Sequence, residues 1–357
     1  MKRKVTKFIS LAIASLMVMG LSAGCGATGN TGGKMYVSVI AKGFQHQFWQ
    51  VVKKGSEKAA SDLGVEIYFT GPEGESAQST QVDMLNAELA KNPKAICLAA
   101  LNTEAVLSQL QEAANKKIPV IGFDSGVPNA PAGQIAANAS TNNEAAAALG
   151  AEKMFEALKS EITAATASNP VVISILSQDA TSASITGRTK GFAEKMMELA
   201  KSVNQGEVAI TGGYSAINKG DASKAAVKIE VTVSATPDIT DMTSSANGLL
   251  NSNNLKGVFC SNEGAVNGLL AAVNAGSRIP SGVQVVGFDA GAGQKAAVKN
   301  GVFLGSITQD PYQIGYKAVE MAVKAAKGEA VSDVDTGAKW YDKSNMEQED
   351  IAQLLYD

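Results

Sequence analysis

The sequence IGFDSG, residues 121–126, returns in nearly the same form as VGFDAG, residues 286–291. In both runs an apolar, strand-like segment ends in Gly-Phe-Asp and is followed by a small residue and a glycine. The aspartate then lies at the carboxyl end of a buried strand, which is where open parallel sheets bind their ligands. The repeat predicts two similar sheets that face each other across a cleft, each contributing one aspartate, Asp124 or Asp289.

Around both runs, short apolar segments alternate with longer amphipathic ones. The expected strands cover residues 36–40, 65–69, 95–98 and 119–123 in the first half, and 171–175, 229–233, 257–260, 283–288 and 302–307 in the second. The expected helices cover residues 48–63, 77–90, 104–115, 143–158, 185–200, 240–250, 265–275 and 312–327. Apolar strands joined by helices are typical of parallel sheets covered on both faces. The fold class is therefore α/β, with two doubly wound parallel-sheet lobes of about 150 residues each.

The N-terminus has the pattern of an export signal. Residues 1–24 combine four basic residues with an apolar stretch and a small-residue cleavage site before Cys25. That stretch is shorter than the roughly 20 residues that span a bilayer. Cys25 resembles the lipid-modified cysteine of bacterial lipoproteins, although Leu21 stands one place farther from it than usual. Residues 25–34, rich in glycine and threonine, are interpreted as a flexible tether.

The net charge and the cysteine content of the chain limit which partners and cofactors we expect. Loss of residues 1–24 changes the net charge from -3 to -3 - 4 = -7, and an acidic body without a basic cluster argues against nucleic acid. Cys97 and Cys260 end strand-like runs in different halves, so we expect two buried free thiols. No metal or cofactor is expected, because Asp333 and Asp335 lack the spacing of a calcium loop.

Residues 42–49 follow the first expected strand and hold an uneven share of rare side chains. His46 is the only histidine of the chain, and Phe48 and Trp49 stand beside it. Flat rings fit the C–H faces of a sugar, and a few polar groups bind its hydroxyl rim, as in most small-molecule sites. The same aromatic pair also fits ordinary packing at the start of a helix.

Polar residues also follow strands of the second half. Arg188 lies in a helix that opens with a Ser/Thr-rich loop, Asn262 follows residues 257–260, and Gln309 follows residues 302–307. Each one alone also fits a solvated position.

These markers together resemble the type I periplasmic binding proteins of the ribose-binding class, the sugar-binding components of ABC importers. The resemblance covers residues 36–343, and its markers are residues 46–49, 118–125, 188 with 191–192, 261–263, 286–289 and 309–311 with 314–315. It implies a first lobe of residues 35–137 and 310–337, a second lobe of residues 138–309 and 338–357, and a three-strand hinge. The chain departs from the family pattern in three places. Residues 99–102 lack the polar ligand that is common in ribose binders, and the stretch directly before residue 240 lacks the aromatic residue that often caps the sugar. Residues 205–226 are interpreted as an insertion.

The resemblance also implies roles for single residues and for the whole protein. The expected ligand contacts are His46, Phe48, Trp49, Asp124, Ser125, Arg188, Asn262, Asp289 and Gln309. The expected function is capture of a monosaccharide-like ligand for an ABC importer. The protein is expected to be a monomer that is secreted and anchored by a lipid on Cys25 at the outer face of the cell membrane, or located in the periplasm. Its partners are then the ligand, the permease subunits of the importer and the membrane.

Other functions fit the same sequence. A sensor that reports to a membrane receptor uses the same closed lobes, and the fold also suits a furanone-type signal or a nucleoside. An enzyme is disfavoured, because the Gly-x-Gly-x-x-Ala pattern at residues 291–296 lies late in the chain and no Gly-x-Ser-x-Gly elbow is present.

Overall fold

The two Gly-Phe-Asp runs end equivalent strands of two separate sheets in the computed structural model, which describes residues 33–357. Residues 34–357 form one compact unit, and the two lobes below are its parts. The expected signal segment, Cys25 and nearly all of the expected tether lie outside the described residues. No helix within residues 33–357 has the length and apolarity needed to cross a membrane.

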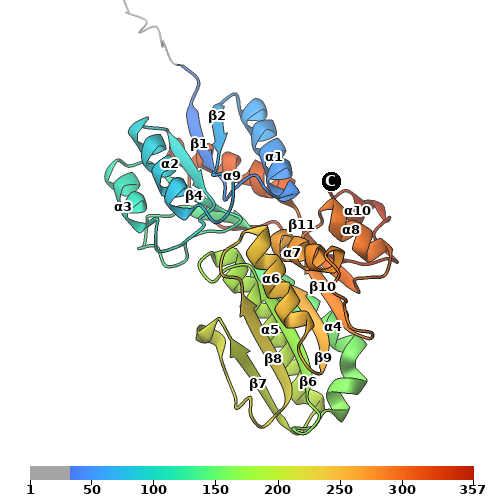
Figure 1. Ribbon diagram of the computed structural model, residues 1–357. Helices are drawn as coiled ribbons and strands as arrows, with labels where there is room; N and C mark the ends of the chain where they lie inside the picture. Colours follow the sequence, from blue (N-terminus) through green and yellow to red (C-terminus); the bar gives the residue numbers. More distant parts are fainter. Residues whose placement is uncertain (1–32) are drawn as a thin grey trace, which may run out of the picture. The chain divides into compact units, whose positions relative to one another are not determined.

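The first lobe is built on a parallel sheet of six strands (Figure 1). Their order is β12 (Val334–Asp335), β5 (Ala137–Ser140), β4 (Val120–Phe123), β3 (Ala95–Leu98), β1 (Tyr36–Ile40) and β2 (Glu66–Thr70). The helices of this lobe are α1 (Gln47–Leu63), α2 (Gln78–Ala90), α3 (Leu107–Asn115) and α9 (Pro311–Ala326). Cys97 packs with the cluster that includes α1 and α9, whereas its neighbours Ile96 and Leu98 pack with α2 and α3. Because both faces are covered, the central strands β3 and β4 are apolar and fully buried.

The second lobe repeats this plan. Its sheet has the order β13 (Ala338–Tyr341), β11 (Gly305–Gln309), β10 (Gln284–Phe288), β9 (Leu255–Cys260), β6 (Val171–Ser177), β8 (Ala225–Val233) and β7 (Glu207–Gly212). Its helices are α4 (Asn143–Ala164), α5 (Ala183–Val203), α6 (Ile239–Leu250), α7 (Glu263–Asn274), α8 (Ala292–Lys299), α10 (Glu349–Ala352) and the 3-10 turn η1 (Ser215–Ile217). All pairings are parallel except that of β11 with β13. The α/β class with two parallel-sheet lobes is confirmed.

Three crossings join the lobes. The chain passes from β5 to α4 at Thr141, from β11 to α9 at Asp310, and from β12 to β13 at Gly337. At the second crossing the Asp310 side chain accepts the N–H of Gln313, and Pro311 occupies the first turn of α9, where no partner for its nitrogen is needed.

Two details of the sequence interpretation are wrong. No strand was expected within residues 205–226, but β7 forms the edge strand there and pairs with β8. The expected lobe boundary at 137/138 falls inside β5, which pairs with β4 and β12 of the first sheet. In both places the segment is rich in small residues, so its apolar pattern is too weak to mark a strand.

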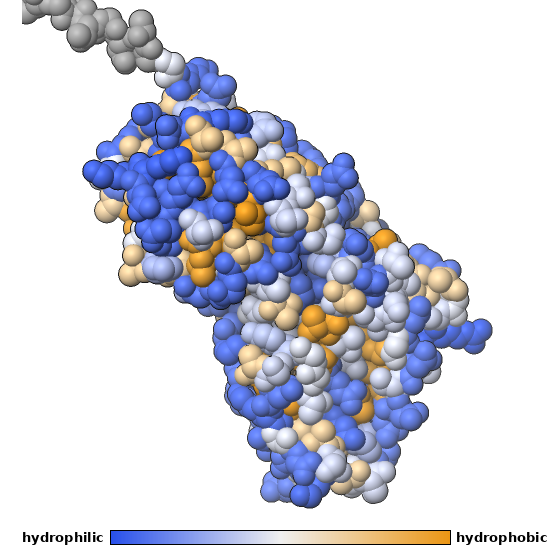
Figure 2. All heavy atoms as spheres, turned by 60° about the vertical axis from the view of Figure 1, so that its left-hand side comes forward, coloured by the Kyte–Doolittle hydropathy of each residue, from blue (hydrophilic) through white to orange (hydrophobic). Residues whose placement is uncertain are grey.

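The cores leave the surface largely polar. On the face that Figure 2 shows, hydrophilic residues predominate and apolar ones form only small groups. Cys97 and Cys260 are buried free thiols in β3 and β9, as expected. A close helix contact lies between α4 and α5, where a Cβ on Gly191 would come within 2.3 Å of the Glu144 carbonyl oxygen. Because residue 191 is a glycine, α5 packs closely against α4, and this contact helps to position Arg188 one turn earlier in α5.

Candidate ligand-binding site

A small cavity of about 20 Å³ lies between the lobes, where the carboxyl ends of both sheets meet. This volume holds little more than one water molecule and is far below the roughly 300–1,000 Å³ of small-molecule pockets, so the lining must move apart to admit a ligand. Of the nine expected contact residues, eight line it, and Lys42, Glu75, Ser184, Ile185 and Glu263 complete the lining. Hydrogen bonds between the lobes close it off, among them Gln178 Nε2 to Glu75 (2.8 Å) and Thr181 Oγ1 to the Leu101 carbonyl (3.1 Å).

The two aspartates occupy equivalent positions in the two lobes. Asp124 and Asp289 both have left-handed backbone conformations, with φ of 51° and 77°. Their N–H groups bond to the neighbouring strand in the same way, to Ala139 O (3.1 Å) and Ile307 O (2.7 Å). Aspartate tolerates this conformation better than most residues, and such strain concentrates at functional sites. The tight turn directs one carboxylate from each sheet into the cavity.

Arg188 lies between these two carboxylates. Its guanidinium nitrogens are 3.9 Å from Asp124 Oδ1 and 3.7 Å from Asp289 Oδ2. Nε donates to Asn143 Oδ1 (2.7 Å), and the guanidinium lies 3.9 Å from the centre of the Phe288 ring. The side chain is therefore buried and held in one orientation, rather than solvated on the helix surface.

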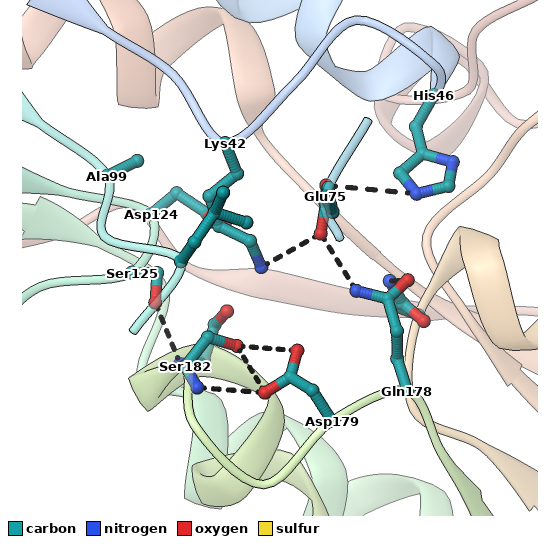
Figure 3. Close-up of polar contacts among 12 residues, drawn as sticks. Lys42, His46, Glu75, Ala99, Asp124, Ser125, Gln178, Asp179 and Ser182 are labelled. Carbon is teal, nitrogen blue, oxygen red and sulfur yellow. Dashed lines mark hydrogen bonds and ion pairs between the residues drawn. The ribbon is translucent and has the colours of Figure 1, made fainter. Parts of the chain in front are cut away.

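A second buried ion pair, which the sequence interpretation missed, joins Lys42 and Glu75 (Figure 3). Lys42 Nζ lies 3.2 Å from Glu75 Oε2, and the other carboxylate oxygen accepts Trp49 Nε1 at 2.8 Å. Burial by itself raises the pKa of Glu75, but the charges of Lys42 and His46 and the two hydrogen bonds lower it to about 2. Glu75 therefore stays ionised inside the protein.

Asp124 has the opposite balance. Burial raises the pKa of Asp124 to about 6, and the nearby charges of Lys42 and Arg188 offset only part of that effect. The pKa of Lys42 is raised, because the attraction of Glu75 and Asp124 exceeds the opposing effect of burial. The cavity therefore has a permanently charged pair on one side and a carboxyl that titrates near neutral pH on the other.

The aromatic residues of α1 are only in part ligand surface. Trp49 is buried, contacts Phe48 edge-on at 5.0 Å between ring centres, and packs on Phe123 at 6.3 Å. His46 directs Nε2 toward Glu75 (3.7 Å), while its Nδ1 is buried without a protein partner (Figure 3). Phe48 and Trp49 pack at the start of a helix and, like His46, also border the cavity, and their contact with a ligand stays a prediction.

The remaining expected residues differ in their freedom to bind. Asn262 is fully engaged, accepting Ala265 N (3.0 Å) as the cap of α7 and donating to Gln178 Oε1 (2.7 Å). Gln309 donates to Asp289 Oδ1 (2.6 Å) and leaves its own buried oxygen without a protein partner. Ser125 does not line the cavity, and its hydroxyl instead accepts Ser184 N across the lobes at 3.3 Å.

Some of the missed residues had a signal in the sequence. Lys42 lies two residues after β1, and Glu75 stands in the loop after β2, so both follow strands that end at the same sheet edge as Asp124. The loop after β3, residues 99–102, contributes none of the lining residues, and its Asn102 donates to Gln78 instead (2.9 Å). Lys42 and Glu75 thus supply the polar groups that this loop lacks.

A polar cavity between two α/β lobes with three crossings defines a two-lobe binding protein. The model of the periplasmic binding protein domain matches residues 37–330, so the chain belongs to that family. Within it, the chain is a type I binding protein of the ribose-binding class.

Curated relatives and solved structures resemble nearly the whole chain. The D-allose-binding periplasmic protein of Escherichia coli is 25% identical over 84% of this chain and 86% of its own length. A Brachyspira murdochii structure described as "ABC transporter, LacI family transcriptional regulator" is 41% identical, covers 91% of this chain and 99% of its own, and has a TM-score of 0.75. A carbohydrate transporter solute-binding protein from Agrobacterium radiobacter, in complex with D-arabinose, is 25% identical, covers 90% and 99%, and has a TM-score of 0.74.

Proposed function

We propose that this protein captures a neutral monosaccharide-like ligand between its lobes and delivers it to an ABC importer. The observation that carries the proposal is the pair Asp124 and Asp289, which approach one cavity from two sheets with Arg188 between them. Carboxylates accept hydrogen bonds from ring hydroxyls, and the guanidinium donates to ring or hydroxyl oxygens. The D-allose and D-arabinose proteins named above support a sugar.

The charges of the cavity favour a neutral ligand over an anionic one. Four carboxyl groups line it, from Glu75, Asp124, Asp289 and Glu263, against the two cations Lys42 and Arg188. The carboxyl groups outnumber these two cations, and Asp124 is ionised above its pKa of about 6. A sugar phosphate or a sugar acid would add like charge to a buried site, which is costly without a paired cation.

The role we propose is binding rather than catalysis, by a monomer held at the outer face of the membrane. The support for the anchor is the position of Cys25 after an export signal and before a short tether. Replacing Cys25 with serine is expected to move the protein from the membrane fraction to the soluble fraction. Retention of the variant at the membrane would refute the lipid anchor.

A thermal-shift screen of residues 34–357, the compact unit described above, tests the ligand class. A ligand that binds only the folded state stabilises it by about 2.7 kcal/mol at a hundred times its Kd. We expect neutral pentoses or hexoses to raise the melting temperature, and the matching sugar phosphates and uronic acids to leave it unchanged. A shift from nucleosides or furanone-type signals alone would overturn the sugar proposal, and silence across all classes would favour the sensor.

A further inference from the structure

A reciprocal set of polar contacts between the lobes lies at two helix N-termini. Glu263, in α7 of the second lobe, accepts the N–H groups of Gln47 (3.1 Å) and Phe48 (3.3 Å) at the start of α1 in the first lobe. In return, Gln47 Oε1 accepts the N–H of Ala292 (2.8 Å) at the start of α8 in the second lobe. Each lobe therefore caps a helix of the other.

Neither helix has a side-chain cap of its own. His46 precedes α1, and its side chain makes no capping hydrogen bond. Gly291 precedes α8 and has no side chain that could cap it. The first N–H groups of a helix lack partners within the helix, and its N-terminus attracts negative charge. When the lobes separate, these groups return to water, so the caps exist only in the closed arrangement.

The glycine at the end of the second Gly-Phe-Asp run makes room for both caps. A Cβ on Gly291 would lie 2.9 Å from Glu263 Oε1 and 3.0 Å from Gln47 Oε1. The two capping side chains therefore meet over this position, and the same run that supplies Asp289 also admits the contact between the lobes.

The caps also connect to the ligand site. The backbone N–H of Glu263 donates to Asp289 Oδ2 at 3.0 Å, and α1 carries Phe48 and Trp49, with His46 directly before it. The Phe48 ring additionally packs against Tyr356 of the second lobe, with 6.5 Å between ring centres. The orientation of these cavity residues thus depends on the contact between α1 and the second lobe.

We propose that Glu263 and Gln47 form a reciprocal helix-capping clasp that sets the balance between open and closed lobes. Glu263 is then a positioning residue, because its two carboxylate oxygens bind the α1 backbone rather than the ligand. The clasp holds the aromatic end of α1 over the cavity and slows release of the ligand. Its effect on affinity rests on the proposed sugar-binding function, whereas its effect on lobe closure does not.

The test is the variant Glu263→Gln, which keeps the size of the side chain but removes its charge and one acceptor. Spin labels on cysteines introduced at the exposed positions Asn115 and Lys201, one in each lobe, report the distance between the lobes by electron paramagnetic resonance. The labelled protein spans residues 34–357, in which the native Cys97 and Cys260 are buried and do not compete for the label. Isothermal titration and stopped-flow kinetics with the sugar found by the screen measure affinity and dissociation.

We expect Glu263→Gln to shift the ligand-free protein toward longer distances. The dissociation rate is expected to rise about three- to thirty-fold, with a matching loss of affinity and little change in the association rate. Gln47→Ala removes the other cap and is expected to act in the same direction. The control is Glu198→Gln on the exposed surface of α5, where the side chain pairs only with Lys195 of its own helix.

Distances and dissociation rates like those of the unchanged protein in both clasp variants would overturn the clasp, even if sugars bind. A shift in ligand-free distance without any sugar binding would support the clasp and overturn the proposed function. A lowered melting temperature with unchanged distances would show that Glu263 only stabilises the fold, and would also overturn the clasp.

Discussion

Replacing Glu75 with glutamine removes the carboxylate that neutralises Lys42 inside the protein. Both side chains are 3% exposed, and their charged atoms are 3.2 Å apart. Glutamine keeps one acceptor but directs an amide N–H₂ toward the donors of Lys42, Trp49 or Gln178, which now bond to the carboxylate. The variant therefore leaves a buried ammonium without a counter-ion.

Two independent estimates give the size of this effect. Removal of one partner of a buried ion pair costs about 3–5 kcal/mol. The pKa of Glu75 is about 2 instead of 4.5, and a difference of one pKa unit corresponds to about 1.4 kcal/mol, so its ionisation stabilises the fold by roughly 3 kcal/mol. Because the pKa is lowered on folding, this stabilisation is present above about pH 4.5 and is lost as the pH falls toward 2.

Denaturant unfolding of the ligand-free protein measures the loss. At pH 7 we expect Glu75→Gln to lower the free energy of unfolding by about 3 kcal/mol, and to weaken its pH dependence between about 4.5 and 2. Glu57→Gln in the same lobe is the control, because Glu57 forms an exposed pair with Lys53 that is worth less than about 0.5 kcal/mol.

A second variant separates the ion pair from other effects of Glu75. Lys42→Met in the Glu75→Gln background removes the unpaired charge and is expected to restore much of the lost stability. A loss below about 1 kcal/mol at pH 7 for Glu75→Gln would refute the reasoning. The absence of any recovery in the double variant would refute it as well.

Three further predictions concern the cavity and its support. Asp289→Asn should keep the left-handed turn (φ 77°), which asparagine tolerates, but lower sugar affinity about ten- to a hundred-fold by titration calorimetry; an unchanged affinity would remove Asp289 from the site. Sugar affinity should fall between pH 7 and pH 5, because the ligand's hydroxyls prefer the ionised form of Asp124 and its pKa is about 6, and Asp124→Asn should flatten this profile. Gly191→Ala should lower the free energy of unfolding by about 1–3 kcal/mol in denaturant, because the new Cβ clashes with the Glu144 carbonyl 2.3 Å away; wild-type stability would show that α4 and α5 part without strain.

Most strands and helices could be predicted because each one buries its own apolar pattern. The helix α9, expected at residues 312–327, lies at Pro311–Ala326, and β6 covers the expected residues 171–175. The elements that were missed are short or weakly apolar. β12 has two residues and β7 begins with Glu207, and both exist because a neighbouring strand offers unpaired backbone groups at a sheet edge.

The cavity was only partly predictable, because motifs identify residues but not their partners. The repeated aspartates marked both walls, and Arg188 was expected from the family pattern. Ser125 follows Asp124 directly, yet its hydroxyl bonds to the backbone N–H of Ser184 and it does not line the cavity. Glu75 carries no motif, and its importance arises from the approach of Lys42, Trp49 and Gln178, which are distant from it in sequence.

The sequence by itself determined the α/β class, the two-fold repeat of the lobes and the aspartate at each sheet edge. These features depend on local patterns, namely apolar periodicity and the placement of Gly-Phe-Asp at a strand end. Only the tertiary structure decided which charges pair in the cavity and which helix ends the lobes cap for each other. Such contacts join residues as far apart as Gln47 and Glu263, and their energies depend on burial and on distances of a few ångströms, which exist only once the lobes have packed together.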